Sequence, residues 1–304
     1  MRPESGFTLI ELVVTIVIIA IIVTAVAFFL DPLRQSTDVA MRAELTDIAD
    51  NALQRMGRDV KLALPNSVRA TTAAGASYLE FLALRTAGRY RGEGGGAAGG
   101  TDCPADDAAL GTPGNDQLSF DTVNDTCFKT VGKIADAATI VLNSDQVVLN
   151  NLGMGFPQQN AYETAPANRA AITALQTTEA NRDRIVFARA SPFVRSLHDS
   201  PGKRFFMTSG PVSYVCDPAL RTLRRHWGYT PPVPWDQPAD QPTSFVGGSS
   251  ALIAEHVTAC GFDYTNVGPQ LNLLTMRLTL QRPRFDGTSE TVSLYHAVHV
   301  NNTP

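Results

Sequence analysis

The chain has 304 residues, with 25 lysines and arginines against 29 aspartates and glutamates, and a formal net charge of −4. This length is sufficient for one large domain or two small ones, in addition to a membrane anchor. The slightly acidic balance provides no excess of positive charge for a polyanion, so a nucleic acid is not an expected partner.

An apolar tract runs from Phe7 to Leu30 and contains one charged residue, Glu11. As an α-helix that rises about 1.5 Å per residue, it would cover about 36 Å, enough for the hydrocarbon core of a bilayer. We therefore predict a transmembrane helix over 7–30. A carboxylate in such a helix costs about 2.5–3.5 kcal/mol near the bilayer centre, so Glu11 is expected to have a cationic partner. Cleavage between Gly6 and Phe7 would expose an α-amino group that supplies this charge, in the same chain or in a neighbouring copy.

Residues 6–11 read Gly-Phe-Thr-Leu-Ile-Glu and lead directly into the apolar tract. This N-terminus resembles that of type IV pilins and type II secretion pseudopilins. The resemblance implies a leader peptide over 1–6, cleavage after Gly6 by a prepilin peptidase, and N-methylation of Phe7. It also assigns Glu11 to assembly with other pilins on an inner-membrane assembly platform. A Sec-type signal peptide would have a basic n-region, a shorter apolar core and a small-residue cleavage site, which differ from this N-terminus.

The same resemblance implies a location. The chain is expected to cross the inner membrane once, with a C-terminal head in the periplasm, and then to enter a pilus or pseudopilus.

A second helical pattern covers 31–64. Apolar residues recur at every third or fourth position and charged residues fill the other face, which predicts an amphipathic helix in water. Pro32 is expected to kink the helix without ending it, because proline removes one backbone donor and crowds the preceding turn. The apolar stripe needs a partner surface and consists of Val39, Met41, Leu45, Ile48, Ala52, Met56, Val60 and Leu64.

The remaining chain, 65–304, is predicted to form a head made mainly of strands. A short helix is expected over 168–175, and either a helix or a strand over 250–256. Segments 271–280 and 290–300 predict a long hairpin that turns at 285–287. One long helix followed by strands predicts a pilin-like α+β fold, in which an antiparallel sheet covers the amphipathic helix. The other predicted strands are 78–84 (half-buried), 117–120, 146–149, 184–188, 205–207, 213–216 and 222–229.

Two segments of the head are predicted to be exposed loops, the Gly/Ala-rich stretch 92–100 and the Pro-rich stretch 231–242. Four cysteines follow the membrane segment, on the side where disulfides persist. Three pairings are possible. We favour Cys103–Cys127 and Cys216–Cys260, because each joins neighbours in sequence, while unpaired buried cysteines remain an alternative.

Short motifs scattered over the head resemble one branch of the pilin-like proteins. They lie at 62–67, 88–91, 210–216, 224–229 and 299–302. The branch is that of the MshO-like minor pilins of mannose-sensitive haemagglutinin (MSHA) pilus biogenesis, related to J-type pseudopilins and W-type minor pilins. The resemblance implies a minor subunit, without a cofactor, that initiates or caps a filament. Alternatives are a minor pseudopilin of type II secretion and a pilus-anchored adhesin that binds glycan or DNA.

The sequence contains no pattern typical of an enzyme, since a nucleophile elbow, a His-Glu-x-x-His motif and an activated cysteine are all missing. A metal site is not expected either. His296 and His299 would lie on opposite faces of a strand, and the spacing of the other histidines, His198, His226 and His256, is not that of a ligand set.

A set of aromatic and arginine side chains leaves open a groove for glycan or DNA. Solvated strand faces with aromatic edges packed on the helix explain the same residues more simply. The set consists of Trp227, Tyr229 and Trp235 with Arg182, Arg184, Arg189, Arg195, Arg221, Arg224 and Arg225.

Overall fold

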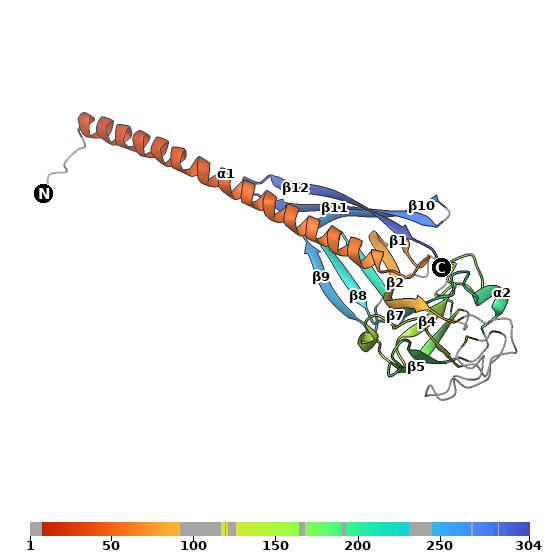
Figure 1. Ribbon diagram of the computed structural model, residues 1–304. Coiled ribbons are helices and arrows are strands. Elements are labelled where there is room, and N and C mark those ends of the chain that lie inside the picture. The colour runs from red at the N-terminus through yellow and green to blue at the C-terminus, as the bar shows by residue number, and fades with distance from the viewer. Residues whose placement is uncertain are drawn as a thin grey trace.

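The computed structural model describes residues 8–91, 117–118, 120, 126–163, 168–189, 193–230, 245–268, 270–284 and 286–304, with side chains of 27–35 left out. The predicted loops 92–100 and 231–242 lie outside these residues. Helix α1 (Leu9–Lys61) extends from a β-rich head (Figure 1). It is continuous through Pro32, so the proline does not end it.

The helix ends at Lys61, three residues before the predicted end at Leu64. The reason is that the backbone of 62–64 forms hydrogen bonds with a strand of the head. The N–H of Leu64 donates to the carbonyl of Leu82 at 2.8 Å, and the N–H of Leu84 donates to the carbonyl of Leu62 at 2.9 Å. Residues 62–64 therefore pair with a strand of the head, where Leu64 is fully buried, and do not complete another helical turn.

Two antiparallel sheets form the head. A nine-stranded sheet has the order β1-β2-β7-β4-β5-β6-β3, with β8 paired to β7 and β9 paired to β8, and a three-stranded sheet has the order β10-β11-β12. A short helix, α2 (Arg195–His198), and a 3-10 turn at Ala137–Thr139 complete the described elements. The strands are β1 (Arg69–Ala73), β2 (Ala76–Arg89), β3 (Cys127–Lys129), β4 (Gln146–Leu149), β5 (Arg169–Gln176), β6 (Arg184–Ala188), β7 (Arg204–Asp217), β8 (Thr222–Trp227), β9 (Ser249–Glu255), β10 (Val257–Gly268), β11 (Leu271–Pro283) and β12 (Ser289–Asn301).

The C-terminal half of α1 lies between the two sheets. It contacts β11 and β12 of the small sheet and β2 and β9 of the large one, and Figure 1 shows the helix flanked by these strands. Leu45, Met56 and Val60 of the predicted stripe are buried there, whereas Val39 remains 70% exposed. Gly57 permits close approach to β12, because a Cβ atom at this position would lie 2.9 Å from Nε2 of His296.

The α+β, pilin-like prediction is confirmed. Strands 146–149 and 184–188 are β4 and β6, and the terminal hairpin is β11–β12. Segment 250–256 corresponds to a strand, β9.

Several local predictions were wrong. Segment 168–175 is strand β5 and not a helix, because it pairs with β4 and β6 inside the sheet. The described residues of 117–120 form no strand. Residues 76–82 are buried on both faces and not half-buried, since Leu79 joins the core around α1 and Leu82 packs beside Tyr162 on the other side.

The predicted strands 205–207 and 213–216 are parts of one strand, β7. Its first part pairs with β4, and the part from Val212 onward pairs with β8. Pro211 lies where the partner on that side changes, and Gly210 has a φ of 97° there. Proline has no backbone N–H to donate to a neighbouring strand. It is tolerated at position 211 because neither β4 nor β8 pairs with this residue.

The part of the head farthest from the N-terminus has its own core. Phe128 lies at its centre, with ring centroids 5.3 Å from Phe205 and 6.1 Å from Tyr90. Gly88 makes room for this cluster, because a Cβ atom there would lie 2.6 Å from the Phe205 ring. The head therefore contains a core around the helix and a second, aromatic core beyond it.

Candidate functional site

The N-terminal end of α1 has a polar structure built from two residues. Thr8 is the N-cap, and its Oγ1 accepts a hydrogen bond from the Glu11 N–H at 3.4 Å. The Glu11 carboxylate accepts in return from the Thr8 N–H at 3.5 Å. This reciprocal capping box satisfies two backbone donors that a helix start leaves free. It holds the Glu11 carboxylate at the N-terminus of the helix.

Thr8 was not among the predicted site residues, although residues 8–11 have the Thr-x-x-Glu spacing of a capping box. The predicted processing residues, Gly6 and Phe7, lie outside the described residues. The structure therefore places Glu11 of the predicted N-terminal site, and adds Thr8 as the residue that positions it.

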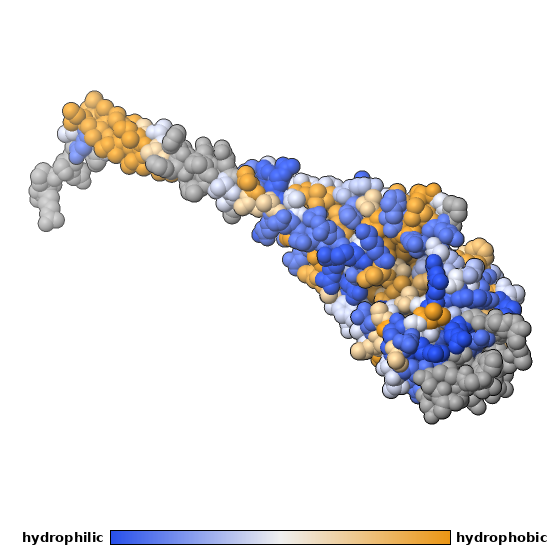
Figure 2. Space-filling model, viewed as in Figure 1, coloured by the Kyte–Doolittle hydropathy of each residue, from blue (hydrophilic) through white to orange (hydrophobic). Residues whose placement is uncertain are grey.

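The surface of α1 behind Glu11 is apolar and has no partner among the described residues. Leu9–Val26 is long and apolar enough to cross a membrane, and none of it is buried. Figure 2 shows hydrophobic side chains covering this end of the molecule. Thr15 and Thr24 add no unsatisfied hydroxyl donor to this surface. Their hydroxyls donate to the carbonyls of Leu12 at 2.8 Å and Ala20 at 2.6 Å. Glu11 is thus the one ionisable group of this span.

The structure describes two of the three aromatic residues of the predicted groove, Trp227 and Tyr229. Tyr229 is 4% exposed, and its hydroxyl donates to buried Glu80 at 2.6 Å, so its ring is no platform for a ligand. Trp227 is 36% exposed and is covered by the Arg225 guanidinium at 5.1 Å. Trp235 lies outside the described residues.

The arginines of that set have partners within the head. Arg189 lies 3.8 Å from the Phe193 ring centroid, and burial lowers its pKa to about 10. Arg182 pairs with Glu179 at 3.3 Å. Arg184, on β6, and Arg224, on β8, lie on strands of the large sheet that are not neighbours.

The histidines whose contacts the structure shows take part in hydrogen bonding or packing within the head. His198 is 1% exposed and accepts at Nδ1 from the Val194 N–H at 2.7 Å. Its Nε2 therefore donates to the Gln158 carbonyl, 2.8 Å away. His296 faces α1 whereas His299 points to solvent, as the strand geometry predicted. Among the described residues, no group of three or more acidic, histidine or cysteine side chains could hold a metal ion.

Cys216 and Cys260 form a disulfide with a Cα–Cα distance of 6.4 Å, as the sequence predicted. The reason differs from the expected one, since the bond joins β7 of the large sheet to β10 of the small sheet. Cys127 is also disulfide-bonded. Its predicted partner, Cys103, lies outside the described residues.

An exposed apolar N-terminal helix that continues into an antiparallel β-rich head is the α+β organisation of a pilin-like fold. Residues 1–27 match the family model described as the prokaryotic N-terminal methylation motif, so the chain carries a type IV prepilin-like N-terminus. This match covers the predicted leader, the cleavage position and most of the apolar span. Comparison with curated proteins and with solved structures returned no match.

Proposed function

We propose that this chain is a minor subunit of a type IV pilus or pseudopilus that joins other pilins through its N-terminal helix. The observation that carries the proposal is the apolar span of α1, unburied and bearing a single carboxylate, within a match to the methylation motif. Such a surface requires lipid or other apolar helices around it. The proposed role is structural and not enzymatic.

Processing is the first step of this proposal. A prepilin peptidase cuts after Gly6 and methylates Phe7, which leaves a new ammonium group one residue before the Thr8 cap. In the membrane, the Glu11 carboxylate of one subunit meets this ammonium group of a neighbour shifted along the filament axis. Each subunit then neutralises a charge that would otherwise be costly in an apolar bundle.

The capping box suggests what Glu11 does before assembly. Its carboxylate accepts from both the N–H and the hydroxyl of Thr8, at 3.5 and 3.4 Å. These bonds partly compensate the carboxylate in the single subunit. They are long enough to be exchanged for a charged donor at about 2.7–2.9 Å, which forms a stronger bond.

The head supports a low-copy position in the filament. Its described residues form twelve strands in two sheets, more than a helix covered by one sheet requires. We assign the chain to the initiating or capping end of an MSHA-type pilus, in the MshO-like branch, with a type II secretion pseudopilus as the alternative. The head would lie in the periplasm, where the Cys216–Cys260 disulfide is stable.

Substitutions at the cap can separate the charge of Glu11 from its capping role. Glu11→Gln keeps a capping acceptor and removes the charge, whereas Thr8→Val removes the cap and keeps the charge. The proposal predicts that Glu11→Gln abolishes recovery of the chain in sheared filaments, while Thr8→Val is recovered and both variants are inserted and cleaved. Normal recovery of Glu11→Gln would contradict the charge-pair mechanism.

The cleavage position is tested separately. A Gly6 substitution should leave the chain at the mobility seen in a strain without the peptidase. A shift to the mature mobility in that variant would reject Gly6 as the processing residue.

A further inference from the structure

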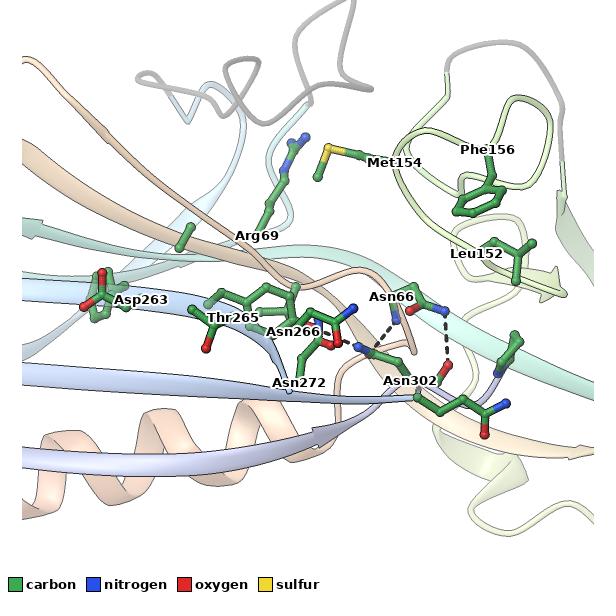
Figure 3. A pocket seen from close by; sticks show the side chains of 16 residues that line it. Asn66, Arg69, Leu152, Met154, Phe156, Asp263, Thr265, Asn266, Asn272 and Asn302 are labelled. Atoms are coloured by element: carbon green, nitrogen blue, oxygen red, sulfur yellow. Dashed lines mark hydrogen bonds between the residues drawn. The ribbon is translucent and has the colours of Figure 1, made fainter. Parts of the chain in front are cut away.

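A cavity lies near the C-terminal end of the chain, beside β10. It has a volume of about 810 Å³ and is bounded by β10, by the segment 66–70 and by the loop 152–156 (Figure 3). Strand β10 is an edge strand of its sheet, so one side of the cavity is an unpaired strand edge. The size is in the range of sites that hold small ligands, roughly 300–1,000 Å³.

Amide side chains form the polar part of the lining. Two of these residues, Asn66 and Asn302, are linked to each other. Asn302 accepts at Oδ1 from the Asn66 N–H at 2.9 Å and donates from Nδ2 to the Tyr264 hydroxyl at 3.0 Å. Figure 3 shows Asn66, Asn302, Asn266 and Asn272 gathered in the same region. The two hydrogen bonds of Asn302 hold its side chain in one orientation without a ligand.

The other amides retain hydrogen-bonding capacity. Asn266 uses its Oδ1 to accept from the Gly268 N–H at 3.0 Å, and Gln270 uses its Oε1 to accept from the Thr303 hydroxyl at 3.2 Å. In the described part of the chain, the NH₂ groups of both residues have no protein partner. Asn272 is half-buried and lines the cavity beside them, and its side chain hydrogen-bonds the Tyr264 hydroxyl.

The opposite side of the cavity is apolar. Leu152, Met154 and Phe156 come from one loop and line it across from the asparagines. Phe156 is 50% exposed, although it is a large aromatic residue. The loop passes close to the backbone of Asn66, since a Cβ atom at Gly153 would lie 2.6 Å from the Asn66 carbonyl oxygen. Asn66 Nδ2 donates to the carbonyl of Asn151, just before the loop, at 2.8 Å.

Among the described residues that line the cavity, Arg69 is the one cation, and it is engaged with an acid of the head. Its Nε donates to buried Glu80 at 2.7 Å. Asp263 is acidic and exposed. Phosphates and acidic sugars are therefore disfavoured, because they would meet a carboxylate and no unpaired cation.

We propose that this cavity binds a neutral oligosaccharide. Sugar hydroxyls donate and accept at the same atom, and an amide offers a donor and an acceptor side by side, so the two groups match without charge. The C–H face of a pyranose ring is apolar and packs on an aromatic ring such as that of Phe156. This site is separate from the N-terminal helix, so it does not depend on the proposed assembly role.

The test uses the full chain in phosphocholine micelles, because glycoside detergents would compete for the site. Maltotriose, cellotriose, mannotriose and triacetylchitotriose are titrated by calorimetry, with trigalacturonate and an uncharged tetrapeptide as comparison ligands. At least one neutral trisaccharide should bind, and the two comparison ligands should not. Asn272→Leu and Phe156→Ala should each weaken that binding about tenfold or more. Asn51→Leu, an exposed asparagine on α1, should leave it unchanged.

Phe156→Ala keeps the test valid if Asn272→Leu fails to fold, since the Phe156 side chain is half exposed. Three results would overturn the proposal: no binding of any of the four neutral trisaccharides at millimolar concentration, binding that both cavity variants leave unchanged, or binding of the tetrapeptide in place of the sugars. The last result would indicate strand addition to the free edge of β10.

Discussion

Arg225 in β8 donates from Nε to Oδ2 of Asp59 in α1 across 2.8 Å, and this contact joins the helix to the large sheet. The Tyr214 hydroxyl, on β7, donates to the same oxygen at 2.8 Å. The side chains of the ion pair are 20% and 27% exposed, so water screens the pair less than a surface pair. Asp59 therefore fixes how α1 is rotated against the head.

Replacement of Asp59 by asparagine should weaken the head. The change keeps the shape of the side chain, removes its charge and lowers the free energy of unfolding by about 1–3 kcal/mol, because hydrogen bonds to charged groups are lost or weakened. Urea unfolding of the full chain in micelles measures this difference. Asp47→Asn, on an exposed position of the same helix, is the matched control. Equal stabilities of the two variants would exclude this role of Asp59.

A fully buried ion pair in the head makes a stronger prediction. Glu80 accepts from Arg69 Nε at 2.7 Å, from Tyr229 at 2.6 Å and from Ser213 at 3.0 Å. The side chains of Arg69 and Glu80 are 1% and 0% exposed. Glu80→Ala leaves the guanidinium buried without its counter-charge, so we expect a loss of about 3–5 kcal/mol in unfolding free energy.

A double-variant cycle tests whether the loss arises from the pair. The combination Glu80→Leu with Arg69→Met should be more stable than Glu80→Leu alone, because no buried charge is left unpaired. If the two single losses simply add in the double variant, the pair is not the origin of the effect.

The overall architecture was predictable because the signals for it are local and long. The apolar tract behind Phe7 and the 3.6-residue stripe from Leu45 to Val60 each extend over several turns. Segment 168–175 was misassigned because its alanines favour a helix, whereas the strand is specified by pairing with β4 and β6. The single strand β7 was divided in two because Gly210 and Pro211 are typical of a turn. At that point β7 changes its neighbour from β4 to β8, and this change depends on tertiary contacts that a local sequence pattern does not show.

The disulfide between the sheets should contribute measurably to stability. Replacement of both Cys216 and Cys260 by alanine should lower the unfolding free energy by about 2–4 kcal/mol under oxidising conditions, because the bond restricts the unfolded chain. Thermal unfolding of the wild type and the double variant is compared with and without reductant. The difference should shrink when reductant is present. A difference that reductant leaves unchanged would mean that lost packing, and not the bond, causes it.

Three buried tyrosines predict a loss of stability in alkali. Burial raises the pKa of Tyr90, Tyr214 and Tyr229 above the ordinary value, and the nearby carboxylates of Asp199, Asp59 and Glu80 add to this. The folded chain therefore keeps these phenols protonated above about pH 10, where the unfolded chain releases the protons. Stability is complete below that pH and falls above it, by up to about 1.4 kcal/mol per pH unit for each tyrosine.

Tyrosinate absorbance and unfolding followed in the same alkaline titration measure this linkage. We expect part of the absorbance to appear only with unfolding. Ionisation of every tyrosine before the head unfolds would contradict the assignment.

The candidate sites differ in how far the sequence could indicate them. Glu11 could be identified from the sequence because it is the one charged residue in a long apolar tract. The cavity could not, since its amides come from three separate segments, around Asn66, Asn272 and Asn302, that only the sheet register brings together. A stacking role of Tyr229 stayed open in the sequence because its hydrogen bond to Glu80 depends on the pairing of distant strands.

The central claim is that cleavage exposes an amino group that a neighbouring Glu11 neutralises. The intact mass of the chain purified from membranes tests it most directly. The account predicts a mature chain that begins at Phe7 and is heavier than the unmodified sequence by one CH₂ unit, because methylation replaces one hydrogen by a methyl group. A chain that retains residues 1–6 in cells with an active peptidase would contradict it.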